Sequence, residues 1–292
     1  MVKINQVLLS AGIHGNEKTG IYLIKKLQNA SALISRNSFT PQTLLANHKA
    51  IELNQRYYEI DLNRCFAATK IDNKPQLYEE QLAQKIYRHV KESQVDFVLD
   101  FHTTTANMGL TLMLTSDRPL NLQLAAYLAA TNPLIKIVRS DQGLYQNRFR
   151  HLFPLGFTVE MGAVAPNVID PVWFSRAEQL VMQILDYIEK TNQGNQPPSP
   201  KNILVYSMSE PIYFPTDYQG EIAGMVTPEL HGNDYSPIQP GEIIFKRFDG
   251  ENIAYQGKNI THPIFINETA YWEKKIAMYS TTRENKDVPA VS

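Results

Sequence analysis

The sequence predicts an α/β fold: a mixed, mostly parallel β-sheet with helices on both faces, followed by a smaller β-rich domain. Over about the first 190 residues, short apolar runs alternate with segments whose apolar residues recur at helical spacing, as in a covered parallel sheet. Residues 191–200 (TNQGNQPPSP) contain three prolines and no large apolar side chain, which is typical of a linker. Beyond them, proline and glycine separate short strand-like runs. We therefore expect two domains, residues 1–192 and residues 201–292.

Each element of the larger domain is predicted from its local pattern. Residues 76–91 form the clearest helix, because apolar side chains such as Leu82, Ile86 and Val90 lie near one face. Residues 95–101 (VDFVLDF) form the clearest strand, because β-branched and aromatic residues are enriched there. The other expected elements are strands 6–10, 41–47 and 157–161, helices 19–28, 121–131 and 176–190, and, in the C-terminal domain, strands 202–208 and 242–248.

Charge balance and hydropathy argue against several classes of protein. Lysine and arginine total 28 against 29 acidic residues, so there is no general attraction to nucleic acid or to an anionic membrane. No apolar run approaches the roughly 18 residues that a transmembrane helix needs. The single cysteine, Cys65, excludes an intrachain disulfide and favours a reducing compartment. We expect a soluble cytoplasmic protein that binds a small molecule, and neither nucleic acid nor membrane.

A histidine and a glutamate follow the first predicted strand at the spacing of a metal site. His14 and Glu17 lie three residues apart in a strand-end loop, where α/β sheets usually bind ligands. His102, at the end of the strand 95–101, is a candidate third ligand, since zinc often takes two near ligands and one distant one. Asp100 lies on the same face of that strand and could orient the imidazole. The pattern alone leaves open that the HxxE spacing is accidental and that His102 is only hydrogen-bonded.

Five ordered blocks then supply a resemblance that covers nearly the whole chain. They are HGNEKTG at 14–20, DLNR at 61–64, DFHTTTANMG at 100–109, VEMG at 159–162 and NETAY at 267–271. In this order the blocks resemble the aspartoacylase family, which is grouped with the succinylglutamate desuccinylases in the zinc carboxypeptidase-like fold group. The resemblance implies one zinc ion per chain held by His14, Glu17 and His102. It also implies a hydrolase domain and a β-rich C-terminal domain that covers the site.

The resemblance implies two catalytic residues. Glu160 matches the general base that takes a proton from water and passes it to the leaving amine, and on an apolar strand desolvation would push its pKa toward working pH. Arg56 matches the arginine that polarises the substrate carbonyl. From the residues alone, Glu160 could equally be a surface glutamate on an edge strand, and Arg56 an ordinary exposed arginine.

The remaining expected substrate contacts also come from the resemblance. Asn63 and Arg64 would bind a substrate carboxylate, arginine through its bidentate fork. Tyr271 matches a substrate-contacting tyrosine; without the resemblance, an ordinary half-buried aromatic is the better interpretation. The family holds the substrate's side-chain carboxylate with an arginine preceded by a tyrosine. Here Tyr145 is followed by both Arg148 and Arg150: Arg150 fits by its distance to Glu160, Arg148 by its closeness to Tyr145, and the sequence does not choose.

The sequence therefore predicts a zinc-dependent amidohydrolase that converts N-acetyl-L-aspartate to L-aspartate and acetate. One alternative is a deacylase of another N-acyl amino acid, such as N-succinyl-glutamate or an N-acetyl aromatic amino acid. A second alternative is a non-catalytic metal- or carboxylate-binding module, which would need neither Glu160 nor Arg56. The resemblance permits a homodimer.

Overall fold

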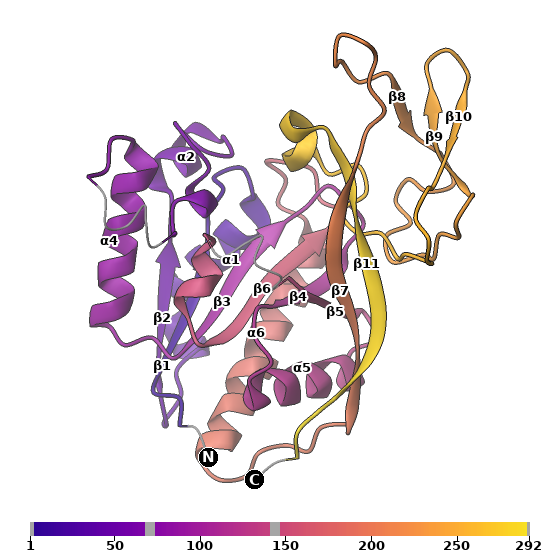
Figure 1. The fold of residues 1–292 in the computed structure, drawn as a ribbon. Coiled ribbons are helices and arrows are strands. Elements are labelled where there is room, and N and C mark those ends of the chain that lie inside the picture. The colour runs from indigo at the N-terminus through magenta and orange to yellow at the C-terminus, as the bar shows by residue number, and fades with distance from the viewer. Residues whose placement is uncertain (1–2, 68–73, 141–146, 291–292) are drawn as a thin grey trace.

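An eight-stranded sheet forms the centre of the computed structural model, which describes residues 3–67, 74–140 and 147–290. Its order in this described part is β11-β7-β5-β4-β6-β3-β1-β2 (Figure 1). β4 runs antiparallel to β6 and β11 antiparallel to β7, whereas the other neighbouring strands are parallel, so the predicted mixed and mostly parallel sheet is confirmed. The strands are β1 Gln6–Ala11, β2 Thr40–Leu45, β3 Phe97–Thr103, β4 Gly109–Leu114, β5 Ile135–Arg139, β6 Leu155–Gly162, β7 Asn202–Tyr213 and β11 Ile276–Asp287.

Helices cover both faces of this sheet, as expected. Alternate side chains of β1 enter opposite cores: Val7 and Leu9 belong to one apolar cluster and Leu8 to another. A strand with both faces buried must be apolar throughout, which explains the unbroken apolar runs in the sequence. The first cluster packs under α1 (Lys18–Asn29), α5 (Pro119–Thr131) and α6 (Pro171–Asn192), and the second under α4 (Tyr78–Glu92).

Capping moves the start of the longest helix. The sequence pattern places that start at residue 176, but α6 begins at Pro171. The carboxylate of Asp170 accepts hydrogen bonds from the backbone N–H groups of Val172 and Trp173, each at 2.9 Å. Proline at the first helical position costs no hydrogen bond, because that N–H has no partner within a helix. The expected boundary was therefore wrong by more than one turn.

The C-terminal segment has its own sheet but also completes the large one. β8 (Gly224–Val226), β9 (Ile243–Arg247) and β10 (Asn252–Ala254) form a separate antiparallel sheet. In contrast, β7 pairs with β5, and β11 pairs with β7 (Figure 1). A third apolar cluster joins Met113 and Val138 of the first segment to Tyr206 and Phe265 of the second. The large sheet thus contains strands from both sides of residues 191–200. The division into domains 1–192 and 201–292 stays a prediction.

The strand order brings three strand ends to one edge of the sheet. β3 lies between β1 and β6 and is parallel to both. The loop after β1 and the C-terminal ends of β3 and β6 are therefore adjacent, with His102 and Glu160 directly paired in the register. Parallel sheets place ligands at this edge.

Among the described residues, no helix has both the length and the apolar character needed to cross a membrane.

The shared sheet and core predict that residues 1–192 do not fold alone. Without β7, the paired edge of β5 and the side chains of Met113 and Val138 would face water. We expect the fragment to aggregate or to unfold without a cooperative transition, while the full chain shows one by circular dichroism. A monomeric fragment with a sharp thermal transition would contradict this prediction.

Candidate active site

Three buried side chains converge where β1 and β3 end. His14, Glu17 and His102 each offer one ligand atom, and these atoms all lie within 4.8 Å of one another. None of the three is more than 6% exposed. The loop that carries His14 passes against α2 (His48–Leu53), and a Cβ at Gly15 would lie 2.0 Å from the backbone carbonyl carbon of Ala50. Only glycine fits there, which explains its place between the two predicted ligands.

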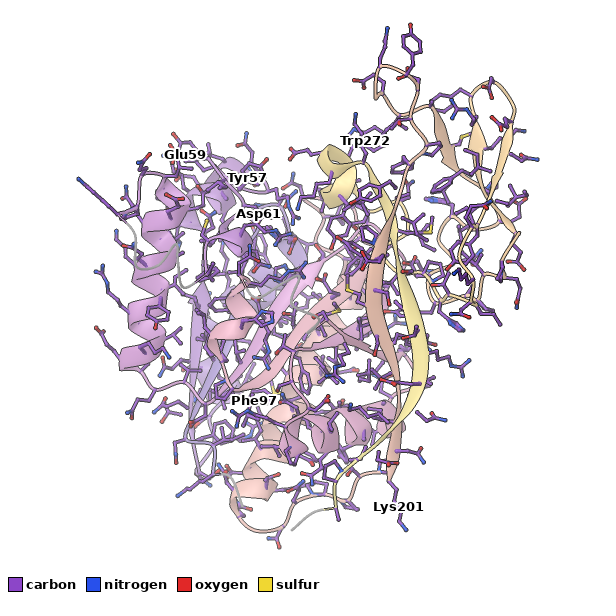
Figure 2. The ribbon with its side chains drawn as sticks, in the orientation of Figure 1. Tyr57, Glu59, Asp61, Phe97, Lys201 and Trp272 are labelled. Carbon is purple, nitrogen blue, oxygen red and sulfur yellow. The ribbon has the colours of Figure 1, made fainter. Side chains whose placement is uncertain are left out.

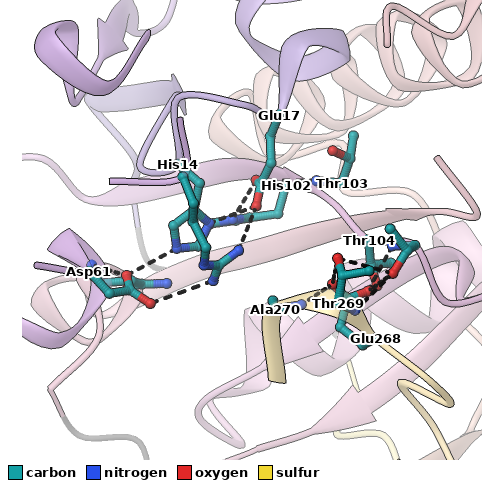
Figure 3. A network of polar contacts seen from close by, with 12 residues as sticks. His14, Glu17, Asp61, His102, Thr103, Thr104, Glu268, Thr269 and Ala270 are labelled. Atoms are coloured by element: carbon teal, nitrogen blue, oxygen red, sulfur yellow. Dashed lines mark hydrogen bonds and ion pairs between the residues drawn. The ribbon is translucent and has the colours of Figure 1, made fainter. Parts of the chain in front are cut away.

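Both imidazoles use their ring nitrogens in the same way, with Nδ1 toward Glu17 and Nε2 toward an aspartate. Nδ1 lies 2.6 Å from the Glu17 carboxylate in His14 and 2.9 Å from it in His102. In His14, Nε2 lies 3.1 Å from Asp61 (Figure 3). In His102, Nε2 lies 2.9 Å from Asp100. Each aspartate can accept an Nε2 proton, which leaves the Nδ1 lone pair for a ligand. The donor set thus fits a divalent cation.

The electrostatics of the cluster also favour a cation. Burial alone would raise the pKa of Glu17, but His14 and His102 outweigh it and hold that pKa well below its ordinary range. Burial alone would lower the pKa of His102, but Asp100 and Glu17 raise it well above the ordinary value. Positive charge at this point is therefore strongly stabilised. A metal ion would supply that charge in place of a proton.

A cleft opens at the three residues. Arg56 reaches it from the segment before Asp61, and its guanidinium lies 3.5 Å from the carboxylates of both Glu17 and Asp61. Burial alone would lower the pKa of Arg56, but the carboxylates of Asp61 and Glu17 outweigh burial and raise that pKa above its ordinary value. The residue therefore stays charged. The cleft is lined by His14, Glu17, Arg56, Asn63, Arg64, His102, Thr103, Thr104, Arg148, Glu160, Phe265, Glu268, Ala270 and Tyr271.

Glu160 lies on β6, an interior strand between β3 and β4. The alternative of a surface glutamate on an edge strand is therefore wrong. Burial raises its pKa to about 7, with the carboxylates of Glu17 and Glu268 adding to the shift and His102 opposing it. A carboxyl group with that pKa can both take and return a proton near neutral pH.

The two candidate arginines have different surroundings. Arg148 lines the cleft. Arg150 is only 2% exposed and donates hydrogen bonds to the backbone carbonyls of Phe153, at 2.9 Å, and Gly156, at 2.6 Å. Its guanidinium thus holds the backbone at the start of β6, and the expected substrate contact of Arg150 is not supported. Tyr145, the tyrosine of this pattern, lies outside the described residues.

Comparison with known proteins decides the family. Residues 3–188 match the succinylglutamate desuccinylase/aspartoacylase catalytic domain, and residues 201–283 match the AstE/AspA barrel-sandwich hybrid domain. The chain belongs to this family. A probable aspartoacylase of Acaryochloris marina is 42% identical over 97% of both chains.

Other relatives in the family carry different names. An N-acyl-aromatic-L-amino acid amidohydrolase of Xenopus laevis is 34% identical over 99% of this chain and 97% of its own length. The crystal structure of murine aminoacylase 3 superposes with a TM-score of 0.94 at 34% identity, covering 100% of this chain and 99% of that one. The relatives are thus named as hydrolases of N-acyl amino acids, and their names differ in the amino acid.

Glu268, to which the sequence gave no expected role, joins the C-terminal segment to the loop after β3 by hydrogen bonds. The Glu268 carboxylate accepts hydrogen bonds from the hydroxyl of Thr104, from Thr105 N at 2.7 Å and from Ala106 N at 3.2 Å (Figure 3). The block at 267–271 contains Glu268, but only Tyr271 was assigned a role. Tyr271 lies in the 3-10 helix η4 (Thr269–Lys274), is buried, and lines the cleft.

Exchanging each arginine for methionine should separate their roles. Arg150→Met leaves two buried carbonyls unpaired, and hydrogen bonds of charged groups contribute about 1.5–3 kcal/mol each. We expect the free energy of unfolding to fall by about 3–6 kcal/mol in urea titrations. The matched control Arg148→Met should change it by less than about 1 kcal/mol. The reverse order would contradict the assignment of Arg150 to structure.

Proposed function

We propose that this chain is a zinc-dependent amidohydrolase that converts N-acetyl-L-aspartate and water to acetate and L-aspartate. One arrangement carries the proposal: the three candidate metal ligands, a carboxyl group with a pKa of about 7 and three arginines line the same cleft. Two imidazoles and one carboxylate form the ligand set of many catalytic zinc sites, which keep one position open. When bound, zinc would supply Lewis-acid polarisation of the acyl carbonyl and a more acidic water.

The chain's own residues would manage the proton and the developing charge. Glu160 takes a proton as water adds to the acyl carbon, and delivers it to the amide nitrogen as the C–N bond breaks. The fixed guanidinium of Arg56 stabilises the negative charge that develops on the carbonyl oxygen. Its carboxylate partners, Glu17 and Asp61, hold it in place before substrate arrives.

The preference for an acidic substrate rests on the number of cations in the cleft. Asn63 and Arg64 are proposed to hold the α-carboxylate, and Tyr271 to contact it from the C-terminal segment. Arg148 is then a further cation on the lining, suited to a side-chain carboxylate. Asn63 also accepts a hydrogen bond from Phe149 N at 2.9 Å, which fixes the backbone next to Arg148.

Removal of an acyl group from an aromatic amino acid is the second candidate. The relatives named for that activity are 34–36% identical over nearly the whole chain. Phe265 and Tyr271 give the cleft some aromatic lining. An aromatic side chain, however, offers no negative charge to the guanidinium of Arg148 on the cleft lining, which disfavours this candidate.

A substrate screen with controlled metal content tests the proposal. The zinc-loaded protein should hydrolyse N-acetyl-L-aspartate with a kcat/KM at least about tenfold above that for N-acetyl-tyrosine, because one charge-assisted pair corresponds to about that factor. Its kcat/KM should also exceed those for N-acetyl-glutamate and N-succinyl-glutamate, whose side-chain carboxylate is one methylene further from the scissile amide. A chelator should abolish the activity and added zinc should restore it. A preference for N-acetyl-tyrosine would favour the second candidate, and metal binding without hydrolysis of any substrate would favour a non-catalytic module.

Glu160→Gln should lower kcat by about 10²–10⁴-fold while the zinc content stays whole. In the wild type, the rate should fall as pH decreases, because the protonated carboxyl group cannot act as a base. Burial raises this pKa from 4.5 to about 7, and a bound cation would lower it again, so the acidic limb should lie between these values. The limb should vanish from the residual activity of Glu160→Gln. Near-normal turnover in this variant, measured across the pH range, would contradict the role of Glu160.

A further inference from the structure

The segment that carries several of the cleft residues has little regular structure of its own. We name residues 54–64, between α2 and the end of the 3-10 helix η2 (Leu62–Arg64), the arginine loop. It carries Arg56, Asp61, Asn63 and Arg64. Figure 2 shows Tyr57, Glu59 and Asp61 of this loop grouped on the same side of the molecule. Without a strand ladder, other partners must fix such a backbone.

A fully buried carboxylate supplies those partners. Glu79, in the first turn of α4, is 0% exposed. Its Oε1 accepts hydrogen bonds from Tyr58 N at 2.7 Å and from Asn47 Nδ2 at 3.1 Å. Its Oε2 accepts from Glu59 N at 3.1 Å and from Ile60 N at 3.2 Å. Three consecutive backbone N–H groups of the arginine loop thus end on one side chain.

The attachment runs in both directions. The carboxylate of Glu59 accepts a hydrogen bond from Tyr78 N, at 2.5 Å, at the N-terminus of α4, where negative charge is stabilised. The amide of Asn47, held by Glu79, also caps α2 by accepting from Ala50 N at 3.2 Å. Glu79 therefore links α4, α2 and the arginine loop.

The loop transmits its position to the candidate metal ligands through Asp61. Asp61 follows directly after Ile60, the last residue bound by Glu79. Its carboxylate lies 3.1 Å from Nε2 of His14 and 3.5 Å from the guanidinium of Arg56. A shift of the backbone at 58–60 would move both contacts.

We propose that Glu79 is a positioning residue for the active site: it fixes the arginine loop so that Asp61 orients His14 and Arg56 points into the cleft. The residues that line the cleft, among those described, do not include Glu79, so it acts through the segments that it binds. Its effect on turnover rests on the proposed hydrolase function. Its effect on metal affinity does not.

Glu79→Gln is the direct test, because it keeps the size of the side chain and replaces one acceptor oxygen with an NH₂ group. This NH₂ group is a donor and cannot accept the hydrogen bonds that the oxygen accepted. We expect zinc affinity to fall about tenfold, the usual loss when a partner of a metal-bound histidine is disturbed. We expect kcat/KM for the preferred N-acyl amino acid to fall about 10–100-fold, since small misplacements cost about that much. Both are measured at a temperature well below the unfolding transition.

Glu80→Gln is the matched control. Glu80 is the next residue on α4, and its carboxylate accepts hydrogen bonds from Gln76 N and Leu77 N at the start of that helix. This variant should lower thermal stability without changing zinc affinity or kcat/KM by more than about twofold.

A double-variant cycle on zinc affinity shows whether Glu79 acts through Asp61. If it does, Glu79→Gln combined with Asp61→Asn should bind zinc about as tightly as Asp61→Asn alone. Independent losses, or a Glu79→Gln protein that is less stable but has wild-type zinc affinity, would overturn the proposal.

If Glu79→Gln does not fold, a second variant tests the same link. Glu59→Ala removes the exposed hydrogen bond between Glu59 and Tyr78 N and should weaken zinc binding about threefold. Unchanged zinc affinity in this variant would then overturn the proposal. If no N-acyl amino acid is hydrolysed by the wild type, the proposed function fails, while this cycle still decides the role of Glu79.

Discussion

The site depends on one carboxylate, that of Glu17, which lies between the Nδ1 atoms of His14 and His102. Three buried groups with lone pairs directed at one another are stable only if positive charge sits among them. The sheet imposes this arrangement, because β1 and β3 are parallel neighbours and their ends must meet. Gly15 then lets the loop pass close enough to α2 for His14 to turn inward. The remaining features of the cleft can be understood as support for this contact.

Carboxylates outside the cluster give the support. Asp100 and Asp61 each face the Nε2 atom of one imidazole, and Ser10 holds Asp100 through a hydrogen bond of 2.7 Å. Glu79 and Glu268 gather backbone N–H groups of the two loops that lie beside the imidazoles. Strands position their side chains through the ladder, whereas loops have none, so buried acceptors take over that task. One buried glutamate thus fixes the arginine loop, and another fixes the loop after β3, which contacts the C-terminal segment.

The cleft itself has the electrostatic character of a site built for chemistry rather than for stability. Arg56, Arg64 and Arg148 face it together, although close like charges oppose one another; Arg148 contributes, after burial, to the lowered pKa of Arg64. A carboxyl group with a pKa of about 7 lies among them. Such opposing shifts in one small volume are typical of active sites, where ligand charge completes the balance. An anionic substrate would complete it here.

The sequence by itself determined the strands and helices with strong periodicity, such as β1, β3 and α4, and the residues at the strand ends. Those features depend on local spacing, which made His14, Glu17 and His102 candidate ligands, whereas the expected roles of these residues and of Glu160 came from the resemblance to the family. It missed the short strands β4 and β5, and it gave no sign that β7 and β11 complete the large sheet, because pairing joins segments far apart in the chain. Only the tertiary structure separated Arg148 from Arg150, since both stand near Glu160 in sequence and differ in what surrounds them. The same holds for Glu268, whose partner Thr105 is 163 residues away, because a hydrogen bond of that span leaves no local pattern.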